Sequence, residues 1–229
     1  MVKVRGGLLV RDVLLIALTA AAGWADTIAY LGLGRVFTAN MTGNLVLLGL
    51  AVGQLQVSSA ERAGAAFAGF VAGGLLGSRL TAKAASHPWH PRVNITLGAE
   101  AAVLIVFSAL WWTGAERSQA GLDTLIGLSA LGMGLQTAAV RRLALAGVST
   151  TFVTGTLSNL VAGLAALRFT DEWTRQAAVL VALPAGAVVG AAIWSRWPAP
   201  AASGPAALVT AVTLAAALAM RPARSEPNG

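Results

Sequence analysis

Six long apolar segments constrain this chain more than any other feature of its sequence. They cover residues 13–33, 63–80, 95–113, 122–140, 177–197 and 206–220. A helix needs about 20 apolar residues to cross a hydrocarbon core of roughly 30 Å, and most of these segments approach that length. The composition agrees, because 56% of the 229 residues are hydrophobic, 11% are charged and the mean hydropathy is +0.72. We therefore expect an all-α, polytopic membrane protein.

Two shorter apolar segments, residues 41–53 and 154–167, lie between the long ones, and each is opened by a polar motif. The first motif reads FTANMTGN from Phe37, and the second reads STTFVTGTLSN from Ser149. Segments of 13 or 14 residues are short for a membrane span. We therefore expect two re-entrant half-helices. Non-helical backbone at membrane depth is tolerated only where protein buries it or where it lines a water-filled cavity.

The two motifs belong to a longer internal repeat, in which three groups of residues recur in the same order. At an offset of 112, the pattern Thr-x-x-x-Thr-Gly-x-Leu that begins at Thr38 recurs at Thr150. At an offset of 117, the glycines at positions 69 and 73 recur at 186 and 190, and at an offset of 110 Asp26 is matched by Gln136. We therefore expect one membrane domain over residues 1–229, with internal repeats over about 13–114 and 122–220.

The distribution of Lys and Arg favours one topology over the others. If both motif segments are re-entrant, each repeat has three spans and the second repeat is inverted relative to the first. With cytoplasmic N- and C-termini, 12 of the 16 basic residues then lie inside and four lie outside, namely Arg35, Arg62, Arg117 and Arg196. If all eight segments span, in two parallel four-helix repeats, the same count is nine against seven. We favour six spans and keep eight spans as the alternative.

The candidate functional residues are the polar groups of the two motifs and two acids within apolar segments. A solute pathway near the midplane is predicted to use Thr38, Asn40, Thr42, Gly43, Asn44, Thr150, Thr154, Gly155, Thr156, Asn159 and Gln136. Asp26 and Glu100 are the candidates for proton coupling, because an ionisable group at membrane depth is costly. Ser, Thr and Asn also cap and join helices in membranes, so a structural role for the motifs stays open. The Gly-x-x-x-Gly series are expected to form helix-packing faces.

The sequence offers no catalytic, metal or cofactor site, and we predict no enzymatic activity. The chain has no cysteine, and its two histidines, His87 and His90, lie between prolines in a basic connection. The net charge of +7 is spread through the connections between apolar segments, which argues against a nucleic-acid partner. The expected partners are the lipid bilayer and a small polar or anionic solute, because the positive ends of the half-helix dipoles would face the centre. A homo-oligomer is compatible with these features.

The motifs GWADTIAYLGLG, FTANMTGN, MGLQTAAVRR and STTFVTGTL, in this order, resemble those of the YoaK-like bacterial membrane proteins, a family of unknown function. The resemblance runs from about residue 14 to residue 196. It implies a multi-pass protein of the bacterial inner membrane and supplies no substrate. From the residues themselves, we expect a small-solute transporter or channel with a midplane site formed by the two Thr-Gly motifs. The alternative is a membrane partner or assembly subunit in which the motifs only pack.

Overall fold

The structure is a computed structural model that describes residues 2–82, 89–143, 153–166 and 170–219; the side chains of residues 2–9, 153, 154 and 171 are not described. Over these residues the chain forms α-helices and one short 3-10 helix, with no strand. The elements are α1 (Val2–Gly32), α2 (Met41–Gly53), α3 (Val57–Thr81), α4 (Pro91–Trp112), η1 (Ala115–Arg117), α5 (Gln119–Arg142), α6 (Val153–Ala165), α7 (Asp171–Trp194) and α8 (Pro198–Ala219). The expectation of an all-α fold is confirmed.

Five of the described helices are long and apolar enough to cross a membrane: α1 from Val10, α3, α4, α7 from Glu172, and α8. The chain is therefore a polytopic helical membrane protein. The short apolar helices also agree with the sequence. The first was expected over residues 41–53 and is α2 (Met41–Gly53), and the second was expected over 154–167 and is α6 (Val153–Ala165).

Helix α5 covers the expected segment 122–140 but is not among the five helices that meet the criterion of length and hydropathy. Its length of 24 residues is sufficient, and glycine, serine, threonine and glutamine lower its hydropathy. The burial of α5 explains how a helix of low hydropathy can lie in the membrane, because every residue from Gly132 to Val140 is buried. A helix that is covered by other helices need not present an apolar surface to lipid.

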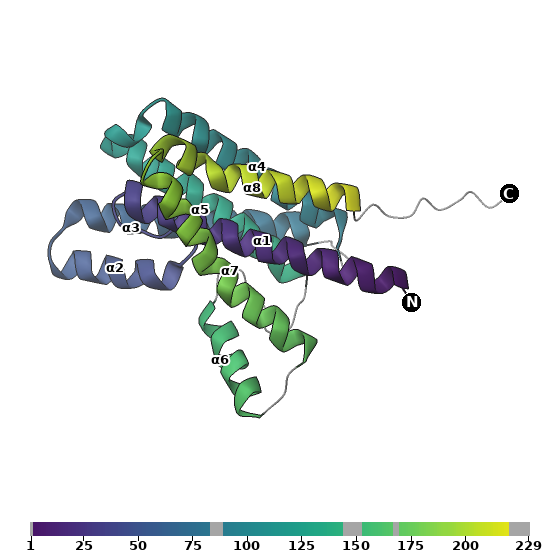
Figure 1. Cartoon of the computed structure of the whole chain (residues 1–229). Helices are drawn as coiled ribbons and strands as arrows, with labels where there is room; N and C mark the ends of the chain where they lie inside the picture. Colours follow the sequence, from purple (N-terminus) through teal and green to yellow (C-terminus); the bar gives the residue numbers. More distant parts are fainter. Residues whose placement is uncertain (1, 83–88, 144–152, 167–169, 220–229) are drawn as a thin grey trace.

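The helices pack in two sets of equivalent pairs. Helix α5 lies against α3 and α4, while α1 lies against α7 and α8. Under the expected repeat, the pair of α3 with α5 is equivalent to that of α7 with α1. The short helices follow the same pattern, since α2 packs on α3 and α6 packs on α7. In Figure 1 the start of α1 and the end of α8 lie at one end of the bundle, and α2 lies at the other end.

Glycines bring the paired helices into close contact. A Cβ atom added at Gly73 would overlap the carbonyl oxygen of Leu131 in α5, and one added at Gly186 would overlap that of Ala20 in α1. Only glycine permits this approach of two helix backbones. The expectation that the glycine series form packing faces is therefore confirmed.

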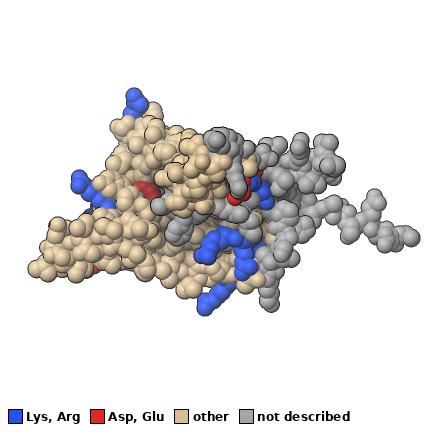
Figure 2. Space-filling model, turned by 90° about the horizontal axis from the view of Figure 1, so that it is seen from below, with Lys and Arg blue, Asp and Glu red and all other residues tan. Residues whose placement is uncertain are grey.

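The outer surface of the bundle is largely apolar. Large hydrophobic side chains stand exposed on several helices, for example Leu75 on α3, Val188 on α7 and Leu214 on α8. Most of the described surface on the face in Figure 2 carries neither acidic nor basic residues. Exposed apolar area of this extent is unusual for a soluble protein and is what contact with a lipid bilayer requires.

Candidate functional site

The connection between α1 and α2 folds back along α1 and is held there by Asp26. One carboxylate oxygen of Asp26, Oδ1, accepts the backbone N–H groups of Thr38 and Ala39, each at 2.7 Å. Asp26 stands six residues before the end of α1, which is about 9 Å along the helix axis. The backbone that leads into α2 therefore lies beside the interior of α1 and not beyond its end.

Thr38 also connects the first motif to α5. Its side chain is fully buried, and the hydroxyl of Ser129 donates to the Thr38 hydroxyl at 3.1 Å. Ser129 lies ten residues into α5, about 15 Å from the start of that helix. The first motif thus reaches into the helix bundle between α1 and α5.

The other polar residues of the first motif stabilise the start of α2. The Asn40 side chain caps the helix by accepting the Gly43 N–H at 3.3 Å. The buried amide of Asn44 binds the backbone of Phe37 twice, accepting its N–H at 2.9 Å and donating to its carbonyl oxygen. Thr42 is exposed. Both asparagines therefore hold backbone groups that an irregular segment would otherwise leave unpaired.

Gln136 lies on the same buried side of the bundle as this motif. Its Nε2 donates to the carbonyl oxygen of Leu18 in α1 at 3.1 Å, and its buried Oε1 has no hydrogen-bond partner among the described residues. Ser129 is therefore linked to Asp26 of α1 through Thr38, and Gln136 binds Leu18 of α1 directly. The later residue of α5 meets the earlier residue of α1, so these two helices run antiparallel.

Glu100 of α4 adds a second acid to the same side of α5. It is fully buried, and neither carboxylate oxygen has a hydrogen-bond partner among the described residues. A Cβ atom added at Gly132 would lie 3.8 Å from Glu100 Cγ, so Glu100 packs against α5 at that glycine. Gly132 lies three residues after Ser129 and four before Gln136, on one face of the helix.

We group five polar residues along this face of α5 as the central polar cluster, namely Asp26, Thr38, Glu100, Ser129 and Gln136; hydrogen bonds link Asp26, Thr38 and Ser129. The cluster combines residues of α1, the first motif, α4 and α5 along one face of α5. Four of its members were expected from the sequence, and Ser129 was missed. Its spacing was an available signal, because Ser129 precedes Gln136 by seven residues, as Thr19 precedes Asp26.

The second motif is described only in part. Thr150 and His87 lie outside the described residues, and so does the side chain of Thr154 at the start of α6. Thr156 is buried and Asn159 is exposed, while a Cβ atom added at Gly155 would meet open space. Among the described residues, α2 and α6 are not one of the helix pairs that pack together. The structure therefore assembles the first motif with Asp26 and α5, whereas the described part of the second motif lies on α6, which packs on α7.

Comparison with known proteins identifies relatives without assigning a function. The family described as "Protein of unknown function (DUF1275)" matches residues 14–218. The UPF0700 transmembrane protein YoaK of Bacillus subtilis (strain 168) is 41% identical over 151 residues, which are 66% of this chain and 66% of that protein. The chain thus spans about two thirds of that relative. No solved structure matches the chain significantly.

Proposed function

We propose that this chain, which belongs to the DUF1275 family of proteins of unknown function, moves a small polar or anionic solute across the membrane as a transporter or channel. The observation that carries the proposal is the position of the first motif. Its polar, non-helical backbone donates to Asp26 in the interior of α1, and the Thr38 hydroxyl accepts from Ser129 ten residues into α5. Such backbone is tolerated at membrane depth where it is buried in protein or lines a pathway, and broken helices of this kind form the binding sites of many transporters.

The proposed architecture has six spans, α1, α3, α4, α5, α7 and α8, with α2 and α6 as re-entrant half-helices in one membrane domain. The antiparallel direction of α1 and α5 supports two inverted repeats, over about residues 13–114 and 122–220, because eight spans would make these two helices parallel. The excess of Lys and Arg on one side supports cytoplasmic N- and C-termini in the bacterial inner membrane.

The two candidate acids differ in how they are engaged. Asp26 binds the backbone at the start of α2, so it already supplies the negative charge that the helix dipole favours there. Glu100 is buried without a described partner, and an ionised carboxylate in that state is costly. Water or a solute that reaches Glu100 would change that cost. We therefore propose Glu100 as the first candidate for proton coupling, ahead of Asp26.

A structural role for the motifs is the competing proposal, and specific contacts favour it. Asp26, Asn40 and Asn44 all bind backbone groups of the first motif, so these side chains are used within the protein. In that case the chain acts as a membrane partner or assembly subunit, without a solute pathway.

Solvent access distinguishes the two proposals, and the absence of cysteine makes the test clean. We expect single-cysteine variants Thr42→Cys and Thr154→Cys to react with a membrane-impermeant, water-soluble thiol reagent, because a pathway holds water. Val181→Cys is the matched control, since Val181 is 65% exposed on the apolar face of α7 and would contact lipid. Equal protection of Thr42→Cys, Thr154→Cys and Val181→Cys would contradict a pathway and favour the structural role.

A further inference from the structure

A cavity of about 430 Å³ lies at the end of the bundle where α2 turns back into α3. Its polar lining consists of Arg35, Gln54, Gln56, Ser59 and Arg62, and Gly34, Val36 and apolar residues of α2 complete the wall. None of the lining residues is acidic. The volume is within the range of small-molecule sites, and the cavity is separate from the central polar cluster.

Arg62 is fixed in this cavity by two features of its surroundings. Its Nη2 donates to Oε1 of Gln119, at the start of α5, at 3.3 Å. Its guanidinium also packs on Gly34, where an added Cβ would lie 2.7 Å from Nη1 and where φ is +84°. The Nε–H of Arg62 is buried and has no acceptor among the described residues. A buried donor without an acceptor is costly, and a bound anion would supply that acceptor.

The positive charge of the cavity is not neutralised within the described part of the chain. Neither Arg35 nor Arg62 forms an ion pair there. The acid nearest in sequence, Glu61, is exposed and does not line the cavity. Asp123 accepts from Gln119 Nε2 at 3.1 Å, so it acts on Arg62 through that amide. Two guanidinium groups therefore share one cavity with only neutral polar groups.

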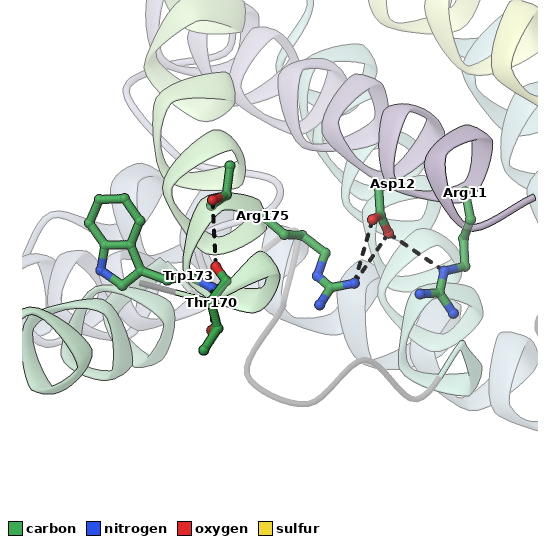
Figure 3. A network of polar contacts seen from close by, with 6 residues as sticks. Arg11, Asp12, Thr170, Trp173 and Arg175 are labelled. Carbon is green, nitrogen blue, oxygen red and sulfur yellow. Dashed lines mark hydrogen bonds and ion pairs between the residues drawn. The ribbon is translucent and has the colours of Figure 1, made fainter. Parts of the chain in front are cut away.

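Another partly buried arginine of the bundle has an acidic partner. Near the start of α7, Arg175 pairs with Asp12 of α1 at 3.5 Å, as Figure 3 shows. Arg11 approaches the same carboxylate at 3.6 Å. Arg62, by contrast, contacts the neutral amide of Gln119 and no carboxylate among the described residues.

We propose that this cavity binds a small oxyanion between the guanidinium groups of Arg35 and Arg62. Guanidinium groups form short, charge-assisted hydrogen bonds to carboxylate and phosphate oxygens. The Gln54 amide can donate as well, because its Oε1 accepts from Gln56 Nε2 at 2.9 Å and its own NH₂ group stays available. This inference rests on the proposed function: the cavity is the docking site of an anionic solute before that solute enters the protein. The same chemistry fits the phosphate of a lipid headgroup.

Charge-selective labelling tests the site. Ser59→Cys places a thiol in the cavity wall, and Val57→Cys, two residues away and outside the lining, is the matched control. Each is treated with a sulfonate-bearing and a trimethylammonium-bearing methanethiosulfonate, with rates normalised to those of a free thiol. At low ionic strength, the two positive charges that share the cavity with Ser59 should favour the anionic reagent at Ser59→Cys by about tenfold relative to the control. Arg35→Gln, at an exposed position, and Arg62→Gln should each reduce that ratio.

Protection by an anion separates the two sources of ligand. At constant ionic strength, inorganic phosphate should slow labelling of Ser59→Cys in lipid-free detergent and leave Val57→Cys unchanged, if the ligand is a free anion. If the ligand is a lipid headgroup, vesicles of phosphatidylglycerol should protect Ser59→Cys without phosphate, and vesicles of phosphatidylcholine should not. A reagent ratio equal to the control that neither arginine variant changes, or no protection in either arm, overturns the site.

This result is independent of whether a pathway exists. If Ser59→Cys shows charge selectivity and protection while Thr42→Cys and Thr154→Cys do not react with the water-soluble reagent, the oxyanion site is supported and the transport function is rejected. Water access at those two positions without charge selectivity at Ser59→Cys would do the reverse.

Discussion

Replacing Asp26 with alanine should detach the first motif from α1 and destabilise the protein. The change removes the oxygen that accepts the N–H groups of Thr38 and Ala39 at 2.7 Å. Each buried N–H left without an acceptor costs about 1–3 kcal/mol, so the alanine variant should lose roughly 2–6 kcal/mol of unfolding free energy. Asp26→Asn retains an acceptor oxygen but loses the charge. Because charge-assisted hydrogen bonds are about twice as strong as neutral ones, its loss should be about half as large.

Thermal unfolding of the purified protein in detergent measures this order. For a chain of this size, 1 kcal/mol corresponds to roughly 2–4 °C in Tm, so Asp26→Ala should melt about 4–24 °C below the parent protein, with Asp26→Asn between them. Asp123→Ala is the control, because Asp123 binds only the exposed side chain of Gln119 among the described residues, and it should change Tm little.

Labelling adds a local measurement to the melting temperature. Ala39 is 4% exposed, so Ala39→Cys should resist a water-soluble thiol reagent in the parent protein and react when combined with Asp26→Ala. An unchanged Tm in Asp26→Ala, with Ala39→Cys still protected, would refute the role assigned to Asp26.

Three further predictions follow from the packing and the central polar cluster. Gly73→Ala and Gly186→Ala should each lower stability by about 1–3 kcal/mol, because the added Cβ overlaps backbone of the paired helix, whereas Gly64→Ala, which meets no atom within 4 Å, should be neutral or stabilising in the same melting assay. Ser129→Ala should cost about 1 kcal/mol through loss of its hydrogen bond to Thr38, and a double-mutant cycle with Thr38→Val should show coupling; additive losses would reject that contact. In vesicles with an enclosed pH-sensitive dye, Glu100→Gln should abolish proton movement driven by an imposed pH gradient, while Asp26→Asn retains it. The opposite result would make Asp26 the residue for proton coupling.

The sequence predicted the helices well because apolar length and polar interruption are local signals. Residues 41–53 were expected as one short helix, and α2 has the same bounds. Asp26 and Gln136 were singled out as polar residues inside equivalent helices, and Gln136 is buried and Asp26 half-buried, although their partners could not be predicted. The bonds from Thr38 and Ala39 to Asp26 depend on the path of the connection 33–40, and no periodicity in the sequence records that path.

Other features required the packed structure. Arg35 and Arg62 looked like ordinary basic residues of the connections, because their common cavity exists only once α3 folds back on α2 and meets Gln119 of α5. The low hydropathy of α5 likewise makes sense only from its central position, where other helices take the place of lipid.

The side of the membrane that holds the turn between α2 and α3 tests the central claim most directly. Leu55 in this turn is 87% exposed, and Ser195, which follows α7, is also exposed. In intact cells, an impermeant thiol reagent should label both Leu55→Cys and Ser195→Cys, while Val2→Cys should react only after the membrane is permeabilised. Labelling of Leu55→Cys only after permeabilisation, together with Val2→Cys, would mean that α2 crosses the bilayer, and it would contradict the re-entrant arrangement.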